Sequence, residues 1–129
     1  MTGRRADGFL LLEVILATVL LAIGVGALIT SLSRCLAAAQ SVQNYTVAQT
    51  LLANKSYEFR VERPTDDLDQ EGTFEDYPTF SWSRTLEAVD DDENLTGLWK
   101  QTVAVAWRER GQILTDDVVE YRYLPGKQR

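Results

Sequence analysis

The chain has 129 residues, no histidine and a formal net charge of −6, and its length is typical of a single domain. An acidic chain without clustered Lys and Arg is poorly suited to nucleic acid, because phosphate binding depends on such clusters. The lack of histidine excludes Cys–His and Ser–His–Asp catalytic sets and argues against zinc. We therefore expect neither enzyme activity nor a cofactor or metal. The single cysteine, Cys35, excludes an internal disulfide and is expected to be a small buried residue.

Residues 9–29 form an apolar run in which Glu13 and Thr18 are the only polar side chains. A transmembrane helix needs roughly 20 such residues. Two arginines precede the run, and the next basic residue after it is Arg34. This positive-inside bias keeps the N-terminus cytoplasmic and sends the rest of the chain across the membrane. We therefore predict a single-pass membrane protein with residues 9–31 as the spanning segment.

The apolar run has three possible interpretations: a secretory signal, a plain signal anchor and a prepilin leader. A secretory signal has a neutral apolar region of about 7–15 residues followed by a small-residue cleavage site, whereas this run is longer, acidic near its start and lacks an A-x-A motif at its end. A plain signal anchor fits the length and flanks. It leaves Glu13 unexplained, since an acid inside a bilayer costs roughly 2.5–3.5 kcal/mol. A prepilin leader accounts for the acid.

The segment from Gly8 to Val14 (GFLLLEV) resembles the class III signal of type IV pilins and pseudopilins. A short basic leader, Gly before Phe, Glu at a fixed distance and a following apolar run all coincide. The resemblance implies that a prepilin peptidase cuts between Gly8 and Phe9, removes residues 1–8, and methylates the amine of Phe9.

The same resemblance implies a role in assembly for Glu13, which is fifth in the cleaved chain. There it meets the Phe9 amine of a neighbouring subunit and sets the axial register. Because Phe9 and Glu13 are four residues apart on one helix face, an intrachain pair is the alternative. The chain departs from the common family pattern at Leu10, where many members have Thr or Ser, and at Asp7, where a basic residue is common.

The helix is predicted to continue beyond the membrane. Residues 30–62 contain neither Gly nor Pro, and Pro64 is the first breaker. We expect one helix from Phe9 to about Arg60, whose periplasmic part, residues 32–62, packs on a soluble domain. The following residues in this part recur at helical spacing: Ala48, Leu51, Leu52, Lys55 and Phe59.

The remainder of the chain, residues 63–129, is predicted to form a small antiparallel meander, giving an α+β, pilin-like fold. Its three expected strands are Thr79–Val89, Leu98–Arg108 and Ile113–Leu124. Residues 64–78 are acidic and turn-rich and are predicted to be a loop.

Alternation assigns side chains to the faces of these strands. The middle strand places Val103, Val105 and Trp107 on one face, and its alternate residues on the other. In the first strand Phe80, Trp82 and Leu86 are in phase, and Arg84 interrupts them. In the last strand Val119, Tyr121 and Tyr123 are in phase. We expect Trp82, Trp99 and Trp107 to supply much of the apolar core.

Consecutive acids at Asp90–Glu93 form the one candidate for an ion site. Carboxylates on a loop bind calcium through their oxygen atoms, and some pseudopilins carry calcium loops. The spacing here matches no defined motif, so we predict a solvated loop and no metal.

A second resemblance narrows the family. Residues 48–60 (AQTLLANKSYEFR) are similar to the helix of I-type minor pseudopilins of type II secretion, in which an Ala-Gln pair precedes Ala-x-Asn and Glu-x-Arg. The matching residues are Ala48, Ala53, Asn54, Glu58 and Arg60. This resemblance implies a structural subunit that initiates or caps the periplasmic pseudopilus driving protein export.

The implied partners are J-, K- and H-type minor pseudopilins, the major pseudopilin, the prepilin peptidase and an assembly platform in the bacterial inner membrane. The alternative is a minor pilin of a type IV pilus for adhesion, twitching or DNA uptake, which the Leu21–Gly24 segment also resembles. A single-pass periplasmic enzyme or sensor would need a catalytic constellation that this sequence lacks.

Overall fold

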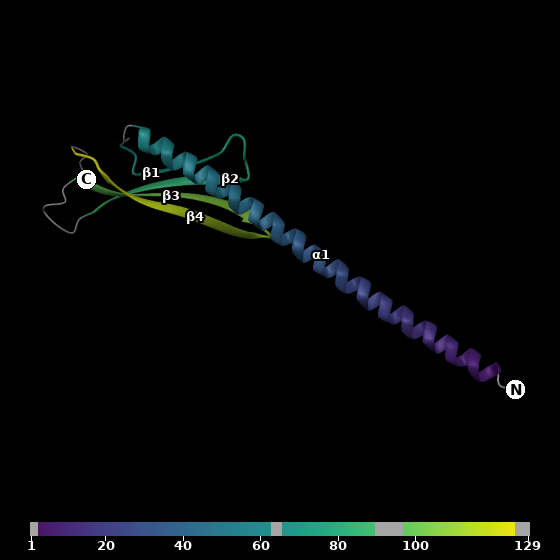
Figure 1. Cartoon of the computed structure of the whole chain (residues 1–129). Helices are drawn as coiled ribbons and strands as arrows, with labels where there is room; N and C mark the ends of the chain where they lie inside the picture. The colour runs from purple at the N-terminus through teal and green to yellow at the C-terminus, as the bar shows by residue number, and fades with distance from the viewer. Residues whose placement is uncertain (1–2, 63–65, 90–96, 126–129) are drawn as a thin grey trace. The chain divides into compact units, whose positions relative to one another are not determined.

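A computed structural model describes residues 3–62, 66–89 and 97–125, with side chains from residue 9 onward. Within these residues the chain forms one helix followed by a four-stranded antiparallel sheet (Figure 1). The predicted α+β class, a long N-terminal helix packed on a small antiparallel sheet, is confirmed. The elements are α1 (Gly3–Val61), β1 (Asp69–Thr73), β2 (Phe80–Ala88), β3 (Leu98–Glu109) and β4 (Gln112–Tyr123).

The chain divides into two compact units, residues 1–42 and residues 43–129. The first unit consists of the N-terminal part of α1. Inside this apolar helix the hydroxyl groups of Thr18 and Thr30 donate to the carbonyl oxygens of Val14 and Gly26, at 2.7 and 2.9 Å. These threonines therefore satisfy their donors within the helix and need no water.

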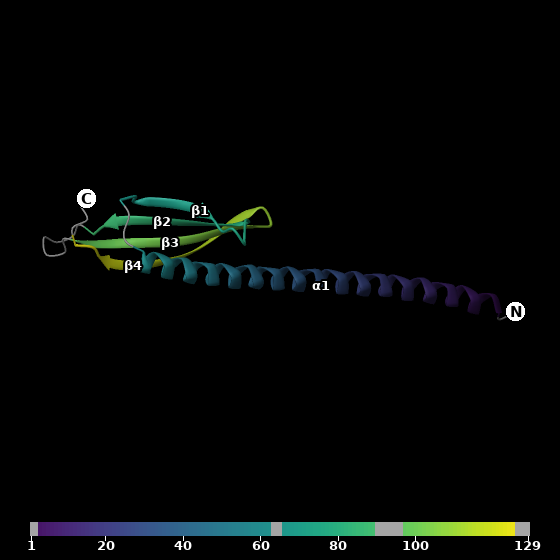
Figure 2. The same cartoon turned by 90° about the horizontal axis from the view of Figure 1, so that it is seen from above.

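The second unit contains the rest of α1 and the sheet, whose strands lie in the order β1-β2-β3-β4 (Figure 2). A two-residue turn, Arg110-Gly111, joins β3 to β4, and both residues have positive φ, 49° and 76°. This is the type I′ geometry that matches the twist of paired strands. The turn lies between the predicted strands Leu98–Arg108 and Ile113–Leu124, although Glu109 and Gln112 already belong to β3 and β4.

The sheet has four strands and not the predicted three. Residues 64–78 are predicted to be a loop, but Asp69–Thr73 form an edge strand, β1, that pairs with β2. Its sequence, DQEGT, lacks apolar alternation, and backbone pairing with β2 holds it in the sheet. A Cβ on Gly72 would lie 2.7 Å from a Trp82 ring carbon, so glycine permits the close approach of the two strands.

The core lies between α1 and the sheet. Apolar residues of β2 and β3 meet a stripe along α1, as the helical spacing predicts. Val103 and Val105 are fully buried and Trp107 is 5% exposed, which confirms the predicted inner face of β3. The buried members of the cluster are Ala48, Leu51, Leu52, Phe59, Phe80, Val103, Val105 and Trp107.

Three expectations about side chains are wrong or incomplete. Cys35 is exposed and not buried. Arg84 does not break the alternation of β2, because its side chain is buried with the apolar residues in phase with it. Of the three tryptophans, Trp99 and Trp107 are buried and Trp82 is half-buried.

The three β4 residues that were predicted to be in phase lie together on the outer face of the sheet. Val119, Tyr121 and Tyr123 are 44%, 64% and 68% exposed. The half-buried residues of β4, which alternate with this set, include Glu120 and Arg122. In β4, therefore, Glu120 and Arg122 share the inner face with Leu114 and Val118, and the two tyrosines lie on the outer face.

Candidate functional sites on the helix and beside its C-terminal end

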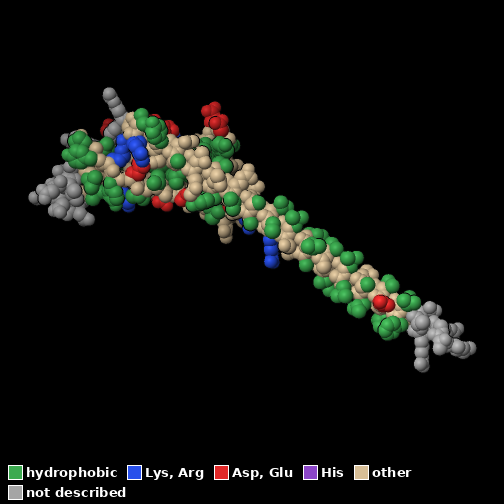
Figure 3. Space-filling model, in the orientation of Figure 1, with side chains coloured by type: hydrophobic (Ala, Val, Ile, Leu, Met, Phe, Trp, Pro, Cys, Tyr) green, Lys and Arg blue, Asp and Glu red, His purple; other side chains and the backbone are tan. Residues whose placement is uncertain are grey.

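The N-terminal part of α1 presents apolar side chains on all sides. Every residue from Phe9 to Leu36 is exposed, and Figure 3 shows apolar side chains spaced along the whole visible length of this segment. Within the described residues this is the one helix long and apolar enough to cross a membrane. A helix that is apolar all round needs lipid or other helices as its surroundings.

The residues predicted for leader processing lie at the start of this segment. Gly8 and Phe9 are consecutive residues of α1, and the Phe9 side chain is 72% exposed. Four of the large apolar residues that follow on the helix are also exposed. These are Leu16, Val19, Leu20 and Ile23, at 58%, 49%, 61% and 64%.

Glu13 is the acid of the apolar segment. It lies one helical turn after Phe9, and its side chain is exposed. Among the residues that the structure describes, its carboxylate forms no ion pair. A carboxylate surrounded by apolar side chains is costly in a bilayer unless a cation pairs with it.

A polar cluster beside the C-terminal end of α1 was not predicted from the sequence. Arg84 is 1% exposed, and its Nε and Nη2 donate to Oε1 of Gln101 at 3.2 and 3.0 Å. Nη1 of Arg122 donates to the same oxygen at 3.1 Å. Burial lowers the pKa of Arg84, Arg122 lowers it further, and Glu62 opposes the shift. One neutral amide oxygen therefore serves two guanidinium groups.

This cluster caps α1. Nη1 of Arg122 donates to the carbonyl oxygen of Phe59 at 2.6 Å, and its Nη2 donates to that of Arg60 at 3.3 Å. A cation at these carbonyl groups also opposes the negative end of the helix dipole. The Arg84 guanidinium lies 4.5 Å from the centre of the Phe59 ring, a cation–π contact. The cluster therefore fixes the end of α1 against the sheet.

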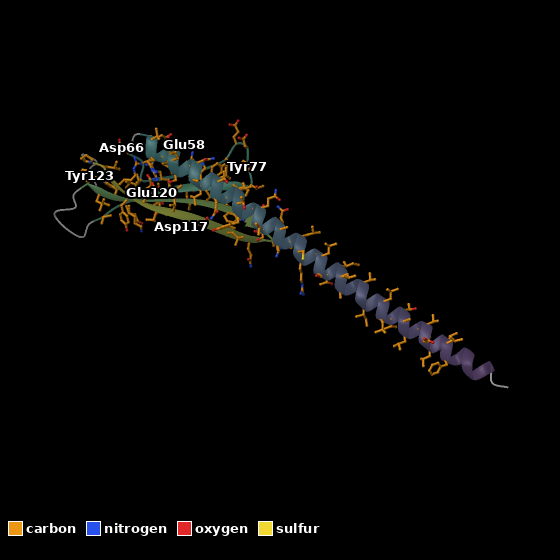
Figure 4. The ribbon with its side chains drawn as sticks, viewed as in Figure 1. Glu58, Asp66, Tyr77, Asp117, Glu120 and Tyr123 are labelled. Carbon is orange, nitrogen blue, oxygen red and sulfur yellow. The ribbon has the colours of Figure 1, made fainter. Side chains whose placement is uncertain are left out.

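Glu120 of β4 makes a second polar contact with the last two turns of α1. Its Oε1 accepts hydrogen bonds from Ser56, at 3.1 Å, and from Arg60, with which it also forms an ion pair. Figure 4 labels Glu120 on β4. The Glu120 carboxylate is thus already neutralised by a residue of α1.

A groove of about 650 Å³ runs between α1 and β4. The helix contributes Tyr45 and Tyr57, which are 47% and 66% exposed. The strand contributes Asp116 and Asp117. The groove therefore combines aromatic surface with negative charge.

The described residues offer no group of three or more His, Cys, Asp or Glu side chains able to hold a metal ion. The predicted loop Asp90–Glu93 lies outside the described residues. Comparison with protein-family models, curated proteins and solved structures finds no match.

Proposed function

We propose that the protein is a minor pseudopilin of a type II secretion system, a structural subunit that initiates or caps the periplasmic pseudopilus. On this proposal prepilin peptidase cuts between Gly8 and Phe9 and methylates Phe9. The apolar segment then anchors the subunit in the bacterial inner membrane, with the N-terminus cytoplasmic and residues 32–129 periplasmic. The protein catalyses no reaction itself.

The observation that carries the proposal is Glu13. It is an acid at the start of an exposed, otherwise apolar helical segment, without an ion-pair partner among the described residues. Cleavage after Gly8 creates a cation on Phe9, and N-methylation leaves that cation charged. Pairing of Glu13 with the Phe9 amine of an adjacent subunit removes the cost of an unpaired charge in the membrane. A plain membrane anchor gives this acid no role.

The fold supports the same assignment. A long helix whose C-terminal part packs on an antiparallel sheet provides one segment for helix-to-helix assembly and one folded domain in the periplasm. The proposed partners are the J-, K- and H-type minor pseudopilins, the major pseudopilin and the assembly platform. A minor pilin of a type IV pilus is the second candidate. It has the same anchor and leader, and the Leu21–Gly24 segment also resembles that class.

Three variants expressed in a deletion strain test the proposal. Gly8→Val is expected to leave the leader attached, which the intact mass of the purified protein reveals. Glu13→Ala is expected to be cleaved and inserted normally but to lose assembly. The control, Glu75→Ala, removes an exposed carboxylate outside both segments that carry the family resemblance and is expected to behave like the wild type.

The readouts are the secreted proteins in the culture supernatant and the pili on the cell surface. Loss of secreted proteins with pili intact supports the secretion system. Loss of pili with the supernatant unchanged moves the protein to the type IV pilus. If Glu13→Ala restores both like the wild type, the assembly role of Glu13 is wrong.

A further inference from the structure

β4 is the last strand of the sheet, and one of its edges has no neighbouring strand among the described residues. Glu109 pairs with Gln112 across the two-residue turn, so the even-numbered residues of β4 bond to β3. The odd-numbered residues from Ile113 to Tyr121 therefore direct their N–H and C=O groups away from β3. Such an edge is a template for another strand.

The side chains along this edge are suited to contact. On the outer face Ile113 and Tyr121 are 67% and 64% exposed. On the inner face the edge borders the groove that contains Tyr45 and Tyr57. A strand added to β4 would place alternate side chains in this groove, against aromatic surface on α1.

Charge decides what kind of strand fits. Glu120 is neutralised by Arg60, but Asp116 and Asp117 form no ion pair within the described residues. The Asp116 carboxylate accepts the Asp117 N–H at 3.1 Å, which covers one donor of the open edge. Figure 4 labels Asp117 on β4.

A second copy of this chain is disfavoured at the edge. In an antiparallel β4–β4 pair, these aspartates lie near the middle of the strand and face their equivalents, and like charges directly opposite destabilise a strand pair. A Lys or Arg on the added strand instead binds the Asp116 carboxylate and releases the Asp117 N–H to a backbone carbonyl of that strand.

We propose that the open edge of β4 binds an extended, basic segment of a different polypeptide as a fifth strand, with its alternate side chains in the groove between α1 and β4. Backbone hydrogen bonds give this mode its affinity, and the pockets for alternate side chains give it selectivity. The proposed segment alternates Lys or Arg with small apolar residues, because one set of side chains faces Asp116 and the tyrosine rings of the groove and the other set lies beside Ile113 and Tyr121 on the outer face.

Hydrogen exchange on the full chain in detergent micelles tests this proposal. The probe is a nine-residue peptide of alternating Lys and Val. It is expected to slow exchange about tenfold or more at the open-edge amides of Ile113, Thr115, Asp117, Val119 and Tyr121, because a bound strand accepts hydrogen bonds from those N–H groups. A Glu–Val peptide of equal length is expected to give no protection.

Two variants locate the charge effect. Asp116→Asn with Asp117→Asn keeps side-chain size and is expected to weaken binding of the Lys–Val peptide about tenfold, since a charge pair at an interface contributes on the order of 1.4 kcal/mol or more. Glu75→Gln with Asp76→Asn removes the same charge from an exposed segment outside the groove and is expected to bind like the wild type.

Three results would overturn the proposal. The first is that a Lys–Val peptide N-methylated on alternate residues binds as tightly as the unmethylated peptide. The second is that the Glu–Val peptide binds as tightly as the Lys–Val peptide. The third is protection of the same amides that rises with protein concentration without any peptide. The last result would make the occupant a second copy. None of these readouts depends on leader cleavage, secretion or Glu13, so failure here is distinct from failure of the proposed function.

Discussion

The two parts of α1 differ in how their apolar side chains are placed. From Phe9 to Leu36 apolar residues occur on all sides of the helix, and every residue is exposed. From Ala48 to Phe59 the apolar residues form a stripe that the sheet buries. The apolar side chains of the first part need lipid or other helices around them, whereas those of the stripe are covered by the sheet. Mutations in the two parts are therefore expected to affect different properties.

The largest effect on stability is expected at Phe59, which is 2% exposed and contacts both Trp82 and the Arg84 guanidinium. Phe59→Ala is expected to lower the free energy of unfolding of the sheet-containing unit by about 3–5 kcal/mol, because it removes buried area and leaves a cavity. Denaturant unfolding of the full chain in micelles, followed by tryptophan fluorescence, measures this. The matched change Leu20→Ala is expected to alter it by less than about 0.5 kcal/mol, and equal losses would contradict the comparison.

A charge in the N-terminal part is expected to act on the membrane and not on the fold. Leu20→Arg adds a penalty of roughly 2.5–3.5 kcal/mol to insertion of the helix, so the fraction of protein resisting alkaline extraction from membranes is expected to fall. Gln49→Arg adds the same charge to an exposed position of the C-terminal part and is expected to leave that fraction unchanged. If both variants extract equally, the two parts of α1 do not differ as proposed.

A smaller loss is expected where α1 ends against the sheet. Gln101→Leu deprives Arg84 and Arg122 of a shared acceptor, and we expect unfolding to be easier by about 1–3 kcal/mol because buried donors lose their partner. Adding Arg84→Met is expected to restore part of this stability, since replacing both partners removes the unsatisfied group as well. Additive losses in the double variant, measured by denaturant unfolding, would show that the two residues are not coupled.

The smallest effect is expected at Gly72, which is linked to α1 through the Trp82 ring that packs on Phe59. Gly72→Ala places a methyl group against Trp82, and overpacking of this kind costs about 1–3 kcal/mol where neighbours are fixed. We expect the lower end, about 1 kcal/mol, because β1 is a short edge strand. Faster amide exchange in β1 with β3 unchanged is the expected measurement. Thr73→Ala is the control, and equal exchange in the two variants would contradict the role of close approach.

The helix and the different side-chain patterns of its two parts could be predicted from the sequence. The long apolar run, the absence of Gly and Pro from residues 30–62, and the spacing of Ala48, Leu51 and Phe59 depend on neighbours along one helix, and the structure has the corresponding segment and buried stripe. The inner face of β3 follows from local alternation in the same way. The Gly8–Phe9 cleavage and the role of Glu13 remain predictions, because they concern a peptidase and other subunits.

Three features depend on contacts between distant parts of the chain: the fourth strand, the buried arginine, and the face on which each β4 side chain lies. β1 is held by backbone hydrogen bonds to β2, which leave no side-chain periodicity to read. Arg84 is buried because Gln101 and Gln70 supply acceptors and Phe59 supplies a ring, and all three are distant from it in sequence. In β4, Arg122 and Glu120 face inward because Arg122 donates to the carbonyl groups at the end of α1 and Glu120 accepts from Ser56 and Arg60. These partners become neighbours only when the chain folds, so no local pattern records them.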